Sequence, residues 1–138
     1  MTHWLYPANT KFYDVLGAFA EKETFWPISS KVAVDDTVYI YLAAPHKQLG
    51  FVCYVKEIGL AESAVLDKVR PFFLKAPEGS KKDKLFMKLK VSKRIALDKG
   101  SLLSLEFLKP NGLNGMLMGP RKLENNPALL TYIQGVTG

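Results

Sequence analysis

The chain has few of the residues that build metal centres and disulfides. Its 138 residues include one cysteine, Cys53, and two histidines, His3 and His46. A single cysteine cannot form a disulfide within the chain, and the Cys/His spacing of a zinc site is missing. Because Cys53 lies in an apolar stretch, we expect it to be a small core residue. No glycine-rich phosphate loop of the Walker or dinucleotide type occurs. We therefore expect no metal and no cofactor.

Long apolar runs are also missing. No run approaches the ~20 residues that a membrane-spanning helix needs, and the first residues lack the basic start and apolar core of a signal peptide. We therefore expect a cytoplasmic protein with no membrane partner. The chain is 48% hydrophobic and 23% charged, which is typical of a soluble globular protein. Its length predicts a single domain over residues 1–138.

Positive charge is concentrated in one segment. Residues 75–99 contain nine basic and three acidic residues, and the rest of the chain contains ten of each, so this segment carries the whole net charge of +6. A local excess of this kind favours a polyanionic partner, most often nucleic acid. The solvated outer face of a strand explains the same lysines equally well.

Hydrophobic periodicity predicts several short strands and two or three helices. We expect strands over residues 4–7, 37–42, 49–58, 85–91 and 102–108. Helices are expected after a cap at Asn9 or Thr10, over 62–69, and from Asn126 as N-cap with Pro127 in the first helical position. Residues 21–30 and 76–83 are expected to be loops, and 114–121 a last strand or a loop. Because β-α-β alternation is missing, these elements predict an α+β fold, a small mixed barrel or an open sheet.

Catalytic groups are sparse, whereas aromatic residues are frequent in the first part of the chain. Asp35 and Asp36 precede a strand, where adjacent acids are usually turn formers. Tyr39 and Phe51 are expected in the core. Trp26 is expected in a polar loop, where an indole forms a stacking wall for a base worth roughly 1–3 kcal/mol. Packing as a lid over one end of the sheet is the alternative for this tryptophan.

Several motifs together resemble the EVE domain of the PUA-like superfamily, which is related to the YTH and ASCH domains. They are Trp4-Leu-Tyr-Pro, Phe25-Trp26-Pro27, Val34-Asp-Asp-Thr-Val-Tyr-Ile-Tyr41, Gly50-Phe51, and Gly115 to Gly119-Pro-Arg121. Asp35 stands where these domains usually have glycine, and aspartate tolerates the positive φ that glycine permits there better than most residues do. The resemblance implies a small PUA-like mixed β-barrel with two or three flanking helices.

The resemblance also implies a non-enzymatic reader of a modified base in DNA or RNA. Trp26 resembles one aromatic wall of the pocket, and serine and asparagine side chains bind the base edge. The pocket residues implied are Asn9, Trp26, Ser29, Ser30, Tyr41, Pro45 and His46. Phosphate contacts are expected from Lys88, Lys90, Arg94 and Arg121.

Two other functions compete with this hypothesis. Some ASCH relatives are thought to act on RNA, so an RNA-processing hydrolase is one alternative, although their Gly-x-Lys-x-x-Glu-x-Arg signature is missing from this sequence. A module that binds a small metabolite or a protein through the same aromatic residues is the other.

Overall fold

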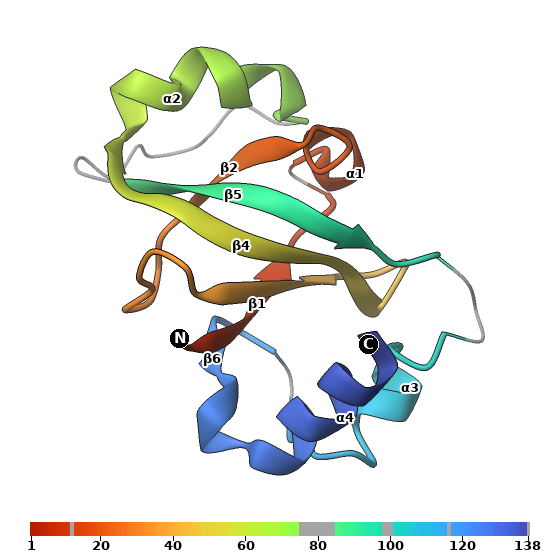
Figure 1. Ribbon diagram of the computed structural model, residues 1–138. Coiled ribbons are helices and arrows are strands. Elements are labelled where there is room, and N and C mark those ends of the chain that lie inside the picture. The colour runs from red at the N-terminus through yellow and green to blue at the C-terminus, as the bar shows by residue number, and fades with distance from the viewer. Residues whose placement is uncertain (12, 75–84, 98–100, 116, 138) are drawn as a thin grey trace.

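Six strands form one mixed sheet in the order β2-β5-β4-β3-β1-β6 (Figure 1). The computed structural model describes residues 1–11, 13–74, 85–97, 101–115 and 117–137. The strands are β1 His3–Ala8, β2 Glu23–Pro27, β3 Thr37–Leu42, β4 Gln48–Ala61, β5 Leu85–Arg94 and β6 Arg121–Lys122. The helices are α1 Val15–Ala18, α2 Glu62–Val69, α3 Leu105–Leu108 and α4 Pro127–Thr137, with 3-10 turns η1 Arg70–Phe72 and η2 Leu123–Asn125.

The predicted α+β class is confirmed, but the sheet is not closed into a barrel. β1 and β3 are parallel, and every other neighbouring pair is antiparallel. Among the described residues, β2 pairs only with β5 and β6 pairs only with β1, so these two strands are edges. The two-residue β6 is too short to extend the sheet further.

The two faces of the sheet carry two separate cores, as the alternation in β3 predicts. Val38, Ile40 and Leu42 pack in an inner core together with α1. Tyr39 and Tyr41 point to the opposite, outer face, where α3 and α4 cover them. Cys53 is fully buried in the inner core, which confirms its predicted role.

The helix α2 and the C-terminal helix α4 follow the predictions closely. α2 spans Glu62–Val69, the predicted range. The side chain of Asn126 accepts a hydrogen bond from the backbone N–H of Leu129 at 3.3 Å, and Pro127 is the first helical residue. α4 continues past Gly135 to Thr137.

Three local predictions are wrong. Residues 23–27 form the strand β2 and not a loop, because they pair with β5. The segment 105–108 is the helix α3 and not a strand, since the N–H groups of Phe107 and Leu108 bind the carbonyl of Ser104. α1 is capped by Asp14, whose carboxylate accepts from the N–H of Gly17 at 3.0 Å, and not by Asn9 or Thr10. Phe12 and the predicted loop 76–83 lie outside the described residues.

The acidic pair before β3 forms a turn, as predicted. Asp35 has a φ of 73°, the positive value that glycine otherwise supplies. Asp36 is 4% exposed. Its carboxylate accepts from the N–H of Thr2 and of Ala33, each at 2.9 Å, and from the indole N–H of Trp4 at 3.0 Å. This carboxylate therefore joins the β2–β3 connection to β1.

Candidate nucleic-acid interface

The outer face of β4 and β5 lies between two helical layers. α2 packs over one end through Val65 and Val69 against Phe86, while α3 and α4 cover the other end around Val52. Figure 1 shows the middle of β4 and β5 crossing the space between α2 and α4. We call the strip formed by Tyr54, Lys88, Lys90 and Lys93 the β4–β5 strip.

Positive charge follows β5. Between Leu85 and Leu97 the sequence has four basic residues and no acidic one. This segment therefore contributes +4 to the net charge, which is +6 for the whole chain. Met87, Leu89 and Val91 are buried in the inner core, so Lys88 and Lys90 alternate with them and point to the outer face. The basic residues 75, 81, 82, 84 and 99 lie outside the described residues.

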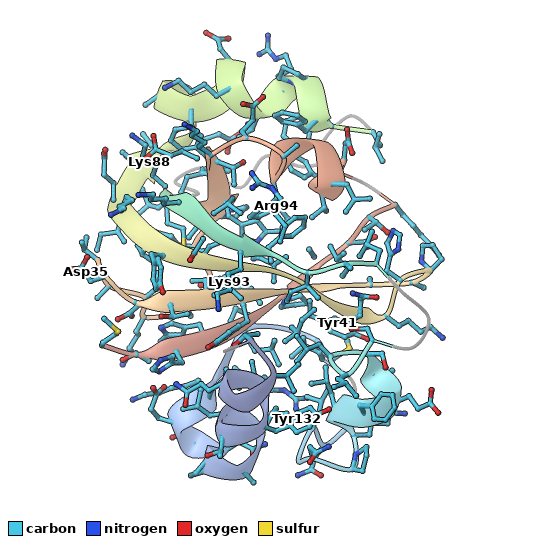
Figure 2. All side chains as sticks on the ribbon, turned by 45° about the vertical axis from the view of Figure 1, so that its right-hand side comes forward. Asp35, Tyr41, Lys88, Lys93, Arg94 and Tyr132 are labelled. Atoms are coloured by element: carbon cyan, nitrogen blue, oxygen red, sulfur yellow. The ribbon has the colours of Figure 1, made fainter. Side chains whose placement is uncertain are left out.

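The three lysines of the strip differ in their partners. Lys88 lies 3.7 Å from a carboxylate oxygen of Glu23 and 3.7 Å from one of Glu57. Lys88 is partly buried, while both carboxylates are exposed. Ion pairs at the protein surface are worth about 0–1 kcal/mol, so a phosphate can compete for this lysine. Lys90 is exposed. Lys93 donates to the carbonyl of Thr137 near the end of α4, and Figure 2 shows it on the sheet above that helix.

An aromatic ring lies in the same strip. Tyr54 of β4 is 40% exposed and stands opposite Lys90 on one side and Thr37 on the other. An exposed ring on a sheet is a surface on which an unpaired base stacks, and adjacent lysines are suited to the phosphates of the same strand.

Arg94 and Arg121, both predicted phosphate contacts, lie away from the strip. The guanidinium of Arg94 donates to the carbonyls of Phe19, Ala20 and Glu21 at 3.3, 2.9 and 3.2 Å. It therefore binds the chain at the end of α1, on the inner side of the sheet (Figure 2). Arg121 is in β6 at the far edge of the sheet, where it donates to the carbonyl of Asn114 at 2.7 Å.

The predicted base pocket is divided among several places. Asn9 and Pro45 lie at the same end of the sheet, because the side chain of Thr10 donates to the carbonyl of Ala44 at 2.9 Å. Asn9 and Pro45 are exposed and His46 is partly buried. Tyr41 is buried, with 8% of its surface exposed, in the core between the outer face of the sheet and the helices α3 and α4. The sheet therefore separates Tyr41 from the inner core.

Trp26 lies on β2 in a cluster of aromatic rings. It is partly buried, with ring centroids 5.5 Å from those of both Tyr13 and Phe19. Burial raises the pKa of Tyr13 to about 12, and the nearby Asp14 carboxylate adds to this shift. The hydroxyl of Tyr13 is buried and has no hydrogen-bond partner among the described residues.

The two predicted serines follow β2 in the chain. The hydroxyl of Ser30 is hydrogen-bonded to that of Tyr6 in the inner core, whereas Ser29 is exposed. The structure therefore brings Ser30 to β1, and it leaves Tyr41 apart from Trp26.

A hollow of about 330 Å³ lies beside the strip, where no pocket was predicted. It is lined by Lys93, Arg94, Ile95, Ser101, Leu102, Leu103, Val136 and Thr137. Among the predicted site residues, only Arg94 borders it.

Sequence reasoning missed Tyr54 and Lys93 as site residues. Both had a signal in the sequence: Tyr54 alternates with the buried residues Cys53 and Val55 of its strand, and Lys93 belongs to the basic segment. A bulge between Val52 and Cys53 shifts the pairing, which sets Lys93 on the outer face opposite Val52 and was not visible in the sequence.

Over the described ranges, no three His, Cys, Asp or Glu side chains are grouped so as to hold a metal ion. In the same part of the chain, the helices are all too short or too polar to cross a bilayer.

Comparison with solved structures gives the fold class: the chain has the PUA-like fold of ASCH domains. It matches a mutant of the ZmASCH protein from Zymomonas mobilis with a TM-score of 0.66 and 11% identity, over 99% of each chain. The ASCH protein of the same organism matches with a TM-score of 0.62 and 16% identity, over 94% of each chain. A hypothetical protein from Leishmania major matches with a TM-score of 0.64 and 18% identity, over 98% of this chain and 93% of that one.

These likenesses concern the fold alone, since the identities are low. No protein-family model matches the sequence, and no curated protein matches it significantly. The fold agrees with the resemblance to PUA-like domains, while membership of that superfamily and the narrower EVE assignment stay predictions.

Proposed function

We propose that this protein is a non-enzymatic module that binds single-stranded nucleic acid, RNA in the first place, on the β4–β5 strip. The observation that carries the proposal is the exposed Tyr54 beside the outward lysines of β5. Stacking on an aromatic ring and phosphate contacts from lysines are together the common means of binding a strand without reading its sequence. The PUA-like fold shared with ASCH domains agrees with an RNA partner.

The strip has the physical properties that this partner requires. The bases of a single strand are free to stack, so Tyr54 is able to contact one, whereas a duplex keeps its bases inside. Glu23 and Glu57 beside Lys88 reduce the local positive charge. The strand is therefore expected to bind mainly near Lys90 and Lys93, with Lys88 contributing once a phosphate displaces one of its carboxylates.

The test is a titration of a fluorescent RNA oligonucleotide at two salt concentrations, with Tyr54→Ala compared with Tyr54→Phe. Loss of stacking in Tyr54→Ala is expected to weaken binding by about 1–3 kcal/mol. Tyr54→Phe keeps the ring and is expected to bind like the unchanged protein. Equal affinity of the alanine and phenylalanine variants would place the strand elsewhere, and salt-independent failure to bind any oligonucleotide would refute the proposal.

A second candidate is the EVE-type reading of a modified base by Trp26. The specific observation in its favour is the unpaired buried hydroxyl of Tyr13 next to the partly buried indole. A buried hydroxyl without a partner is costly, and a base edge would satisfy it. In this function the β4–β5 strip binds the backbone, while Trp26 and Tyr13 contact one flipped base.

Trp26→Ala is expected to abolish discrimination between modified and unmodified bases, while affinity for the unmodified strand changes little. The measurement is competition between oligonucleotides with and without modified cytosine or adenine. Trp4→Phe is unsuitable as a control because the Trp4 indole binds Asp36, so Phe25→Leu on the opposite face of β2 serves instead. An unchanged preference in Trp26→Ala would mean that the pocket is elsewhere.

The competing function is an RNA-processing hydrolase of the ASCH type, because the fold is shared. Incubation of labelled RNA with the protein and divalent metal ions separates the two functions. We expect the RNA to remain intact, and cleavage would contradict the proposal that the protein only binds.

A further inference from the structure

The hollow beside the strip has walls of two kinds. Its apolar wall comes from Ile95, Leu102, Leu103 and Val136. Its polar groups come from Lys93, Ser101 and Thr137, and the described lining residues include no acidic side chain. Arg94 also borders the hollow, but its guanidinium is bound on the inner side of the sheet. Ligand sites commonly pair a mostly apolar wall with a few polar groups that fix the orientation of the ligand. A volume of about 330 Å³ is near the lower limit for such sites, roughly 300–1,000 Å³, and suits one small ring system.

The polar groups offer both a donor and an acceptor within one small space. Lys93 can only donate hydrogen bonds. The acceptor is the carbonyl of Thr137, which Lys93 binds and which belongs to the last turn of α4. The last carbonyls of a helix lack intrahelical partners, and the helix end carries partial negative charge. A phosphate inside the hollow would be repelled by that end. A neutral ring with a donor and an acceptor on its edge suits it better.

The hollow also continues the β4–β5 strip. Lys93 follows Lys90 on the outer face of β5 and is at the same time a lining residue of the hollow. A strand bound along β5 in the direction from Lys88 to Lys93 therefore reaches the mouth of the hollow. The phosphate of its last contacting nucleotide would lie near Lys93, with the attached base next to the hollow.

We infer that the hollow is a subsite for one unstacked nucleobase of the bound strand. This inference rests on the proposed function and adds to it a second base contact, separate from Tyr54 and on the other side of the sheet from Trp26. The base contacts Leu102 and Val136 with its faces. Its edge accepts from Lys93 and donates to the carbonyl of Thr137 or to the hydroxyl of Ser101.

The test uses RNA oligonucleotides in which a single abasic position is moved along the strand. For the unchanged protein we expect two positions at which loss of the base weakens binding, each on the order of tenfold. Val136→Phe, which fills the hollow, is expected to remove one of the two penalties, and Leu102→Ala, which removes part of its wall, to reduce the same penalty. Tyr54→Ala is expected to remove the other.

Leu97→Ala is the matched control, because Leu97 is 44% exposed in the segment after β5 and does not line the hollow. It is expected to leave both penalties unchanged. If RNA binds but both hollow variants keep both penalties, the subsite is refuted and the proposed function stands. If RNA does not bind at all, both are refuted. Saturation by a free nucleoside as tight as by the oligonucleotide would mark the hollow as a metabolite site and overturn the inference.

Discussion

Replacing Lys88 and Lys90 together with alanine is expected to weaken binding of single-stranded RNA about thirtyfold at low salt. A lysine–phosphate contact at about 4 Å in water is worth about 1 kcal/mol, so two contacts give about 2 kcal/mol. Each contact also releases counterions, and the slope of log K against log salt is expected to flatten by about 1.4 for two contacts. Fluorescence anisotropy at four salt concentrations measures both effects.

The matched control for this double variant is Lys109→Ala with Lys122→Ala. Both lysines are exposed. Lys109 follows α3 and Lys122 belongs to β6, so neither is part of the β4–β5 strip. The control therefore lowers the net charge by the same amount as the double variant and leaves the strip unchanged. This control is expected to lose only a few-fold in affinity, with a nearly unchanged salt slope. Equal losses in the two double variants would show that net charge alone binds the RNA.

Replacing Asp36 with alanine is expected to give the largest loss of stability. Its carboxylate accepts three hydrogen bonds, and its removal leaves the indole N–H of Trp4 and two backbone N–H groups without this acceptor. The penalty for such unpaired donors predicts a loss of about 3 kcal/mol. In a domain of this size we expect a fall in Tm of about 10 °C, measured by circular dichroism.

Asp35→Asn is the control for Asp36→Ala. Asp35 is exposed and has a φ of 73°, a conformation that asparagine also tolerates. It is expected to change Tm little, although it removes the same charge from the adjacent position. Similar losses from the two substitutions would mean that the turn, and not the Asp36 hydrogen bonds, limits stability.

The same carboxylate predicts a pH dependence. Burial favours its neutral form, but the hydrogen bonds from Thr2, Ala33 and Trp4 outweigh burial, so the pKa of Asp36 lies below its ordinary value of 3.8. A group with a lowered folded pKa stabilises fully above its unfolded pKa, and this contribution is lost as the pH falls through the folded pKa. The Tm difference between the unchanged protein and Asp36→Asn is therefore expected to narrow below about pH 4.

Most of the strands and both longer helices could be predicted from periodicity and capping residues. β3 and α2 were correct because their patterns are local: alternation over six residues in one, and a polar start with two buried valines in the other. β2 was missed because a short strand with Pro27 reads as a loop, and only its distant partner β5 shows that it is extended. The segment before Pro110 was misread because four closely spaced leucines fit a strand as well as one helical turn.

The candidate site was less predictable, because it depends on which face of the sheet a helix covers. Tyr41 and Tyr54 are both tyrosines in alternating strands, yet α3 and α4 bury the first, and the second is exposed. Arg94 lies on the inner side of the sheet because the bulge in β5, opposite Val52 and Cys53, reverses the alternation of the strand. A sequence pattern does not show such a bulge. Distances between separate segments, such as Asn9 and Trp26, are likewise tertiary properties.

The pairing of β2 has a consequence for the order in which this chain acquires its structure. Trp26 pairs with Met87, about sixty residues further along the chain. On a ribosome, β2 therefore has no sheet partner until β5 has been synthesised, while β1 and β3 find each other much earlier. Closing so long a loop is entropically costly. We expect β2, and with it the aromatic cluster around Trp26, to dock only after β5 is in place, although β2 is the second strand to be synthesised.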